Sequence, residues 1–305
     1  MTKIFIDGSS GTTGLRIRER LSNRDDVDLI TLPENIRRDI NARQDALNNS
    51  DIAFLCLPDK EAIEAVNLIE ANNNHTAVID TSTAHRVDKG WAYGFPELKG
   101  QREKIKASKR IANPGCHATG FISLIAPLVE QGVINSSERL SCFSLTGYSG
   151  GGKKMIAQYN DQNRDELLKS PALYGLSQEH KHLPEMKIIC GLGNAPVFCP
   201  VVADYYSGMQ VTVPLFDTRV KEIVSAYKNY YPENSGLVKI QSYDKNFVYA
   251  NELSGRDDLI ISVFGNDERV ILTARFDNLG KGASGAAVQN MNLLMNADEL
   301  KGLVF

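Results

Sequence analysis

The chain has 305 residues, of which 42% are hydrophobic and 23% charged, and it is long enough for two globular domains. Its formal net charge of -3 gives no indication of the basic surface that nucleic acids and anionic membranes require. No apolar run approaches the roughly 18 residues of a membrane span, and residues 1–10 lead into a strand without a signal-peptide pattern. We therefore expect a cytoplasmic protein that acts on a small molecule.

The first third of the chain predicts alternating strands and helices. We expect strands at 3–6, 27–32, 52–58 and 76–82, and helices at 13–21 and 59–72. Strands that are apolar on both faces and separated by helices are typical of a parallel sheet covered on both sides. The pattern therefore predicts an α/β, Rossmann-like domain over residues 1–115.

The pattern changes after residue 115. We expect a helix over 116–130 and β-rich, antiparallel stretches at 139–150, 208–216 and 258–278, the last with the hairpin signal Gly-Asn-Asp-Glu. Successive strands with few helices between them indicate an α+β domain, here over 116–282. Residues 283–305 return to a helical pattern, and the glycine-rich stretch "GYSGGGKK" is interpreted as a binding loop.

Three glycines at a spacing of three lie between the first strand and the first helix. Gly8, Gly11 and Gly14 let the backbone approach a pyrophosphate, which the amides at the helix start then bind. Ser10, Thr12 and Thr13 of the same loop complete this predicted cofactor site. The spacing differs from the usual GxGxxG pattern, so a tight turn without a ligand is the alternative interpretation.

The end of the second strand bears on which nicotinamide cofactor binds. In NAD-binding domains an acidic residue there holds the ribose 2′-hydroxyl. Neither Thr31 nor Leu32 is acidic, and Arg37 and Arg38 follow soon after, which favours the 2′-phosphate of NADP. Glu34 lies nearby, and the alternative is that both arginines form a solvated helix face.

Cys116 follows a Pro-Gly pair at the start of an expected helix. The backbone amides there favour a thiolate and can also donate to an oxygen on the carbon that the sulfur attacks. The chain has five cysteines without CxxC spacing, so we expect reduced thiols and no metal. Cys56 and Cys142 lie in strand patterns and are interpreted as core residues.

The segment "QEHKHLPEM" offers an acid and a base for this thiol. His180 and His182 alternate along an expected extended segment and so face opposite ways. One of them can point into a cleft, with Glu185 placed to orient His182. His-x-His can also bind a metal, although no further ligands stand out. His117 adjoins the cysteine, but adjacent helical residues point apart, so we interpret it as structural.

The sequence resembles the N-acetyl-gamma-glutamyl-phosphate reductase family, in its shorter bacterial form. Six motifs occur in the family's order: "GSSGTTG", "VIDTSTAHR", "YGFPEL", "NPGCHATG", "HKHLPEM" and "NLGKGASGAAVQNMN". The resemblance implies a semialdehyde dehydrogenase fold that uses NADPH to reduce an acyl phosphate in arginine biosynthesis. It also implies that Cys116 is the nucleophile, which forms a thioester, and that His182 is the acid and base, with Glu185 beside it.

The resemblance implies further contacts and partners. Arg86, with Ser82 as a weaker candidate, is expected to hold the substrate phosphate, as are Gly150 and Lys153 of the glycine-rich stretch. Asn290 is placed to bond the nicotinamide carboxamide, and the C-terminal helix to return to the nucleotide domain. A homodimer or homotetramer is implied as well.

Two alternatives stay open. A related acyl-phosphate reductase, such as aspartate-semialdehyde dehydrogenase or an aminoadipyl-phosphate reductase, shares the thiol chemistry and the cofactor. An inactive NADP-binding regulator is the alternative from another class, and the joint presence of Cys116, His182 and Glu185 argues against it.

Overall fold

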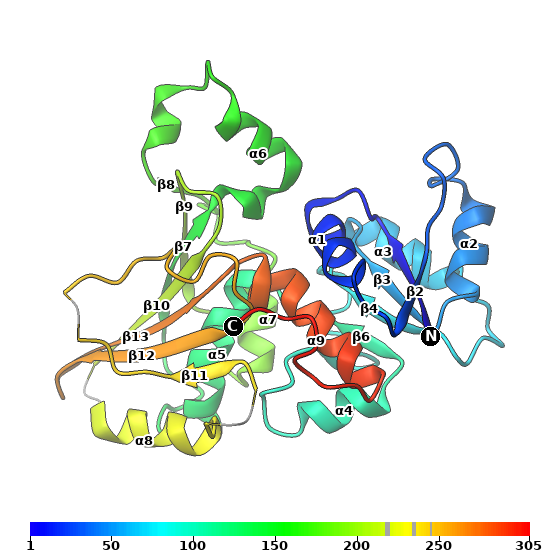
Figure 1. Cartoon of the computed structure of the whole chain (residues 1–305). Coiled ribbons are helices and arrows are strands. Elements are labelled where there is room, and N and C mark those ends of the chain that lie inside the picture. Colours follow the sequence, from blue (N-terminus) through cyan, green and yellow to red (C-terminus); the bar gives the residue numbers. More distant parts are fainter. Residues whose placement is uncertain (217–219, 234–235, 245) are drawn as a thin grey trace. The chain divides into compact units, whose positions relative to one another are not determined.

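The computed structural model describes residues 1–216, 220–233, 236–244 and 246–305, and it divides into two compact units (Figure 1). The first unit contains residues 1–96, 100–115 and 283–303. The second unit contains residues 97–99, 116–282 and 304–305. No helix in the described part of the chain is long and apolar enough to cross a membrane.

A parallel sheet forms the centre of the first unit. Its strands, in the order β2-β1-β3-β4-β6-β5, are Val27–Ile30, Thr2–Asp7, Ile52–Leu55, Ala77–Asp80, Arg110–Ala112 and Ala92–Tyr93. Every neighbouring pair is parallel. The strand order reverses between β1 and β3, which is where doubly wound folds bind their ligands. The predicted Rossmann-like architecture is confirmed.

Helices cover both faces of this sheet. They are α1 Thr12–Leu21, α2 Ile40–Asn48, α3 Asp59–Asn67, α4 Gln101–Ala107 and α9 Gly285–Leu294. Alternate residues of β1 point to opposite faces, so Ile4 and Ile6 join a core that includes Ile17 of α1, whereas Phe5 joins one that includes Leu47 of α2. Because a hydrophobic core lies on each face of the sheet, its strands carry apolar residues on both faces.

Two predicted helices in the first unit are too long. Helix α3 ends at Asn67 and not near residue 72. Just beyond this end, the side chain of Asn48 donates to the Leu68 carbonyl and accepts from the Glu70 amide, both at 2.9 Å, and so holds the chain outside a helix. Helix α9 covers only part of residues 283–305, since Asn296 adopts a left-handed φ of 51° that ends the helix. A short π-helical turn, Gly280–Ser284, precedes it.

The second unit is built on a seven-stranded mixed sheet. Its strands, in the order β11-β12-β13-β10-β7-β9-β8, are Val238–Ile240, Leu259–Gly265, Arg269–Phe276, Met209–Phe216, Ser141–Gly147, Val197–Ala203 and Ala172–Leu173. The predicted hairpin is confirmed as β12–β13. The strand expected at 139–150 is only partly antiparallel, because β7 pairs antiparallel with β10 and parallel with β9.

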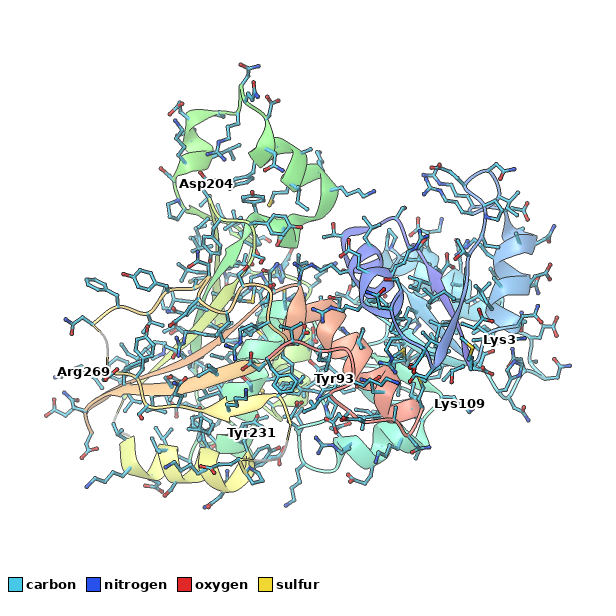
Figure 2. All side chains as sticks on the ribbon, viewed as in Figure 1. Lys3, Tyr93, Lys109, Asp204, Tyr231 and Arg269 are labelled. Atoms are coloured by element: carbon cyan, nitrogen blue, oxygen red, sulfur yellow. The ribbon has the colours of Figure 1, made fainter. Side chains whose placement is uncertain are left out.

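The helices of the second unit are α5 Cys116–Glu130, α6 Gly152–Asn160, α7 Leu183–Ile189 and α8 Val220–Tyr230. Short 3₁₀ turns occupy Tyr148–Gly151 and Glu166–Lys169. The hydroxyls of Tyr227 and Tyr231 (the latter labelled in Figure 2) donate to the carbonyls of Leu124 and Ser123 at 2.7 and 3.1 Å. These bonds tie α8 to α5.

The short segment 97–99 is anchored within the second unit. The carboxylate of Glu97 forms a buried ion pair with Lys281 at 2.8 Å and accepts a hydrogen bond from the Leu237 amide at 3.1 Å. The amide of Lys99 donates to the Tyr230 hydroxyl at 3.0 Å. A buried charge of this kind is stable only with its partner, so the pair fixes the course of the chain here.

Helix α5 lies very close to the sheet at Gly120. A Cβ atom at this position would lie 2.4 Å from Cγ2 of Val211 on β10 and 2.9 Å from Cε1 of Phe276 on β13. Apart from its last turns, α5 is almost fully buried. The absence of a side chain at residue 120 is therefore what lets the helix pack at this distance.

We expect Gly120→Ala to lower the free energy of unfolding by about 1–3 kcal/mol, because an extra carbon in a packed core forces neighbouring atoms apart. Gly193→Ala is the matched control, since its Cβ would meet only the Ser136 carbonyl oxygen at 3.6 Å. Its effect should stay within about 0.5 kcal/mol. Chemical denaturation measures both, and equal effects would contradict the packing argument.

Candidate active site

The loop between β1 and α1 needs glycine at two positions. Gly8 has a φ of 83°, and a Cβ there would lie 2.2 Å from the carbonyl oxygen of Cys56. A Cβ on Gly14 would lie 2.5 Å from the carbonyl oxygen of Gly8. Gly11 is the N-cap of α1 and supplies no side chain to the first helical amides. These amides are consequently available to an anion, as at other helix N-termini that bind phosphate.

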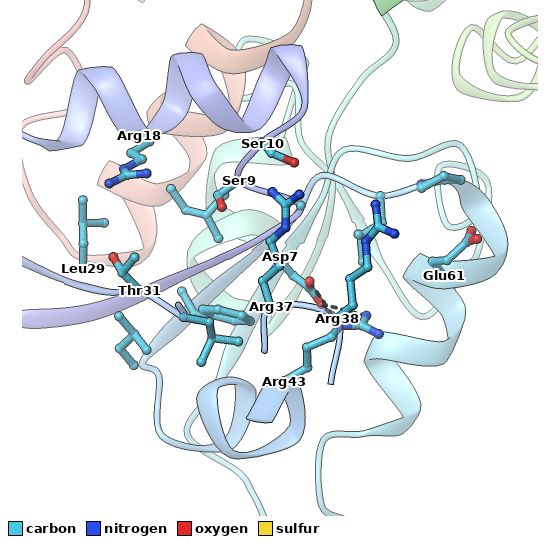
Figure 3. A pocket seen from close by; sticks show the side chains of 17 residues that line it. Asp7, Ser9, Ser10, Arg18, Leu29, Thr31, Arg37, Arg38, Arg43 and Glu61 are labelled. Atoms are coloured by element: carbon cyan, nitrogen blue, oxygen red, sulfur yellow. Dashed lines mark hydrogen bonds and ion pairs between the residues drawn. The ribbon is translucent and has the colours of Figure 1, made fainter. Parts of the chain in front are cut away.

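A pocket of about 470 Å³ lies beside this loop, at the end of the sheet where β1 and β2 finish. Ser9 and Ser10 line one side, and Arg37 and Arg38 line another (Figure 3). The two arginines lie in the turn before α2 and not on a helix, and Arg38 is exposed. Arg37 also forms an exposed ion pair with Glu34, at 3.3 Å.

The charges that line the pocket are predominantly positive. Arg18 and Arg43 join Arg37 and Arg38, whereas the acidic lining residues are Asp7 and Glu61. Arg43 is neutralised by Asp7, to which it donates through two nitrogens at 2.9 and 3.1 Å. Arg18 and Arg43 are not among the residues predicted from the sequence. Arg18 lies one turn after Gly14, and this spacing could have indicated that it lies beside the glycine loop. Only the tertiary fold brings Arg43 to this pocket.

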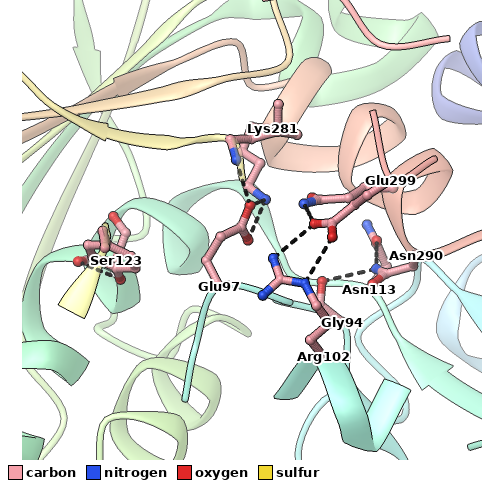
Figure 4. A network of polar contacts seen from close by, with 11 residues as sticks. Gly94, Glu97, Arg102, Asn113, Ser123, Lys281, Asn290 and Glu299 are labelled. Carbon is pink, nitrogen blue, oxygen red and sulfur yellow. Dashed lines mark hydrogen bonds and ion pairs between the residues drawn. The ribbon is translucent and has the colours of Figure 1, made fainter. Parts of the chain in front are cut away.

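Two buried oxygens of the first unit test whether the residues fit a nicotinamide cofactor. Within the described chain, Thr12 Oγ1 and Asn290 Oδ1 have no hydrogen-bond partner. Asn290 Nδ2 donates to the Gly94 carbonyl at 3.0 Å and to Asn113 Oδ1 at 3.2 Å (Figure 4). The amide group is thus held in place while its oxygen can still accept from a carboxamide. Both oxygens fit the group that the glycine loop implies.

The predicted phosphate-binding residues of the first unit lie near the end of β4. Arg86 is buried, and it donates to the carbonyls of Asn113 and Thr81 at 2.9 and 3.0 Å. The Ser82 hydroxyl donates to Asp80 at 2.7 Å. Asp80 also contacts Nδ1 of His85 at 2.6 Å. These side chains are held rigidly, and their contact with a substrate phosphate stays a prediction.

Cys116 is the first residue of α5 and is partly exposed. It lies where the predicted helix begins, directly after Pro114 and Gly115. The other thiols differ in environment: burial raises the pKa of Cys56 to about 12 and the pKa of Cys142 well above its ordinary value. Cys142 lies within β7, as expected, but Cys56 follows β3 and is only partly buried.

The structure brings three histidine rings together in the second unit. The ring centroids of His180 and His182 are 4.8 Å apart, and His117 lies 5.6 and 5.5 Å from them. The prediction that His180 and His182 face opposite ways is therefore wrong. His182 has helical φ and ψ of −85° and −12° as the N-cap of α7, so the period of an extended strand does not apply. Its amide donates to Nδ1 of His180 at 3.2 Å.

His117 occupies a buried position within this cluster. Its Nδ1 lies 2.7 Å from the Ser144 hydroxyl, and its Nε2 lies 2.7 Å from the Tyr174 hydroxyl. Burial, and to a lesser degree the charge of His180, lowers the pKa of His117 to about 3. Ser144 and Tyr174 are not among the residues predicted from the sequence, because no motif or spacing indicates a contact between residues so far apart in the chain.

The remaining predicted residues lie on two helices. Glu185 is in the first turn of α7 and is buried, as His182 is. Gly150 lies in the 3₁₀ turn before α6, and Lys153 is the second residue of α6. The "GYSGGGKK" stretch is therefore not the loop that was expected, since its second half begins a helix.

Throughout the described part of the chain, no three His, Cys, Asp or Glu side chains are grouped so as to hold a metal ion.

Two family models match the chain. Residues 3–108 match the semialdehyde dehydrogenase NAD binding domain, and residues 116–278 match the semialdehyde dehydrogenase dimerisation domain. Among solved structures, aspartate semialdehyde dehydrogenase II from Vibrio cholerae has a TM-score of 0.70 at 16% identity, covering 97% of this chain and 99% of its own. The Candida albicans aspartate semialdehyde dehydrogenase, solved with NADP, has a TM-score of 0.69 at 14% identity, covering 97% and 99%. Such similarity shows the fold.

Curated relatives are much closer in sequence. N-acetyl-gamma-glutamyl-phosphate reductase from Brucella ovis is 46% identical, covering 96% of this chain and 98% of its own. The Brucella anthropi protein of the same name is 47% identical with the same coverage. The chain therefore belongs to the N-acetyl-gamma-glutamyl-phosphate reductase family and is built from the two semialdehyde dehydrogenase domains.

Proposed function

We propose that the chain reduces N-acetyl-gamma-glutamyl phosphate to N-acetylglutamate 5-semialdehyde and phosphate with NADPH, as a step of arginine biosynthesis. The names of its relatives support this reaction. The observation that carries the proposal is the start of α5, where Cys116 is followed by a residue that contacts the rings of His180 and His182. A thiol at a helix start beside imidazole groups is suited to acyl transfer.

In the proposed reaction, the Cys116 thiolate attacks the acyl carbon of the substrate. The carbon–sulfur bond forms as the bond to the phosphate oxygen breaks, which leaves a thioester and releases phosphate. When bound, the reduced nicotinamide would supply the hydride that the thioester carbon accepts. His182, which holds the proton lost by the Cys116 thiol, gives that proton to the resulting alkoxide and so completes the thiohemiacetal hydroxyl. His182 then takes the hydroxyl proton, and the carbon–sulfur bond breaks to release the aldehyde and regenerate the thiolate. The carboxylate of Glu185 stabilises the positive charge that His182 then carries.

The substrate phosphate needs cationic partners, because the chain as a whole is slightly acidic. We assign this role to Arg86, whose planar guanidinium suits a phosphoryl group, with Ser82, Gly150 and Lys153 as further contacts. The hydrogen bonds from Arg86 to the backbone support this assignment, because they fix the orientation of its guanidinium.

NADP is the cofactor that the charges of the first unit favour. Six ionisable side chains line the pocket, and four of them are arginines, so a 2′-phosphate meets an excess of positive charge. The Gly8 to Gly14 loop, including Ser10, Thr12 and Thr13, would hold the pyrophosphate, and Asn290 would hold the carboxamide. Arg37 and Arg38 are the residues assigned to the 2′-phosphate.

The outer face of the second unit's sheet supports a homodimer, which can pair further into a homotetramer. Strand register places Phe143, Ile271 and Phe216 on the face opposite α5, where they are 46%, 44% and 73% exposed. Large apolar side chains on an open sheet face are typical of a protein interface. The family model matched here is described as a dimerisation domain.

A cytoplasmic location belongs to the same proposal. All five cysteines lie in the described part of the chain, and none is in a disulfide, which suits a reducing compartment.

We expect the purified protein to form NADPH from N-acetylglutamate semialdehyde, phosphate and NADP, followed as absorbance of the reduced cofactor. Cys116→Ser should reduce turnover by at least about 10³-fold, because a serine hydroxyl is a far weaker nucleophile than a thiolate. Cys199→Ser, a change of a partly exposed thiol on β9, is the matched control and should stay active. Activity with aspartate semialdehyde alone would instead identify the related acyl-phosphate reductase.

Replacing both Arg37 and Arg38 with Ala should raise the apparent KM for NADPH by about 10- to 100-fold, as expected for the loss of charge-assisted hydrogen bonds. The KM for NADH, which lacks the 2′-phosphate, should change little. Lys60→Ala is the control, because Lys60 is exposed on α3 and does not line the pocket. An equal change for both cofactors would refute the assignment of the two arginines.

Charge on the outer sheet face should separate the subunits. We expect Phe143→Glu combined with Ile271→Glu to lower the molar mass measured by light scattering to that of one chain, because two buried carboxylates would face an apolar surface. Ile188→Glu places the same charge at another exposed apolar position, on α7, and should leave the mass unchanged. If the double variant keeps the parent mass, the interface lies elsewhere.

A further inference from the structure

His117 lies at the centre of a ring cluster to which the proposed reaction assigns it no part. It is only 3% exposed, although it follows the partly exposed Cys116 directly. Its ring contacts those of His180 and His182, and it also meets Phe198 at 5.2 Å between centroids. One side chain thus connects the first turn of α5 to both histidines of the "HKHLPEM" segment.

Two hydrogen bonds fix the orientation of this ring. Ser144 on β7 is fully buried and meets Nδ1, whereas Tyr174, which follows β8, meets Nε2. Both contacts measure 2.7 Å, so rotation of the ring would break both at once. A neutral imidazole has one donor and one acceptor, and two hydroxyls can satisfy both.

Several titratable groups surround the His117 ring. The titratable groups that contact its ring are Tyr174, His180 and His182, and Ser144 and Phe198 complete the surroundings. Cys116 adjoins His117 in the sequence. The low pKa of His117, about 3, keeps it neutral at physiological pH. Burial, and then the charge of Cys116, raises the pKa of Tyr174, so its hydroxyl stays protonated. His117 and Tyr174 are therefore both uncharged, so neither exerts a charge on the neighbouring histidines or on Cys116.

We infer that His117, locked by Tyr174 and Ser144, is a positioning residue that sets the orientation of the His182 ring relative to Cys116. The inference rests on the proposed function, since it assigns His182 as the proton acceptor of that site. A purely structural histidine would satisfy buried hydroxyls and affect only stability. A positioning histidine also changes how readily the thiol ionises and how fast the enzyme turns over.

The experiment compares Tyr174→Phe and His117→Phe with Tyr227→Phe as the matched control. Tyr227 also makes a 2.7 Å hydrogen bond through its hydroxyl in the second unit, but to the Leu124 carbonyl. His117→Gln, whose amide can reach the Tyr174 hydroxyl, tests for rescue. Two readouts are used: kcat and KM, and the pH dependence of Cys116 alkylation by iodoacetamide, followed on the Cys116 peptide by mass spectrometry.

We expect both site variants to lose about 10- to 100-fold in kcat, the size of effect that a small misplacement causes. The KM for NADPH should not change. The midpoint of the Cys116 alkylation profile should rise by about one pH unit, because a misplaced imidazolium no longer favours the thiolate. Tyr227→Phe should lower the melting temperature and leave kcat and the alkylation profile as in the parent, and His117→Gln should recover part of the loss.

The outcomes separate this inference from the proposed function. If turnover is present and both site variants match the parent in kcat and alkylation, the inference is wrong and the function stands. If no reductase turnover is found but the alkylation midpoint still rises in both site variants, the function is wrong and the positioning role stands. A parent Cys116 whose alkylation profile is that of an ordinary thiol would overturn the inference, because no imidazolium would then favour its thiolate.

Discussion

The close approach of α5 to its sheet is the constraint on which the thiol site depends. Gly120 gives the helix no side chain where it meets Val211 and Phe276, so the helix lies against β10 and β13. A helix fixed along one face has a fixed first turn, and this turn holds Cys116 and His117. A larger residue at 120 would lift the helix and would shift its start away from β7, where Ser144 holds the His117 ring.

A comparable constraint acts at the nucleotide pocket. Gly8 and Gly14 are needed because a Cβ atom at either position would lie only 2.2 or 2.5 Å from a backbone carbonyl oxygen. This compact turn leaves the first amides of α1 uncovered. Four arginines then give this pocket an excess of positive charge. Asp7 neutralises the charge of Arg43. Among the described residues, the acidic groups beside the other three arginines are Glu61, which lines the pocket, and Glu34, which pairs with Arg37. In both units, backbone packing sets the position and side-chain charge sets the chemistry.

Sequence patterns predicted what depends on neighbours along the chain. Two-faced apolar strands specified the parallel sheet, and the Pro-Gly pair specified where α5 begins, at Cys116. The patterns failed where a tertiary contact decides. His182 has helical backbone angles because α7 starts there, so a strand period misplaced its ring. Tyr174 and Arg43 belong to no motif near their partners, and only the folded chain brings them to His117 and Asp7.

The low pKa of His117 links the stability of the second unit to the chemistry of the thiol. An imidazole in an unfolded chain has a pKa of about 6.5, whereas burial lowers the pKa of His117 in the fold to about 3. Between these pH values the unfolded chain binds a proton that the folded chain does not, so the stability that His117 contributes falls as the pH drops below about 6.5. Burial of His117 therefore makes the fold less stable at acidic pH. In return, a neutral ring lies 5.5 Å from His182, where a second imidazolium would repel any proton that His182 takes up. Burial of His117 thus keeps an additional positive charge away from His182, the residue that we propose as the acid and base.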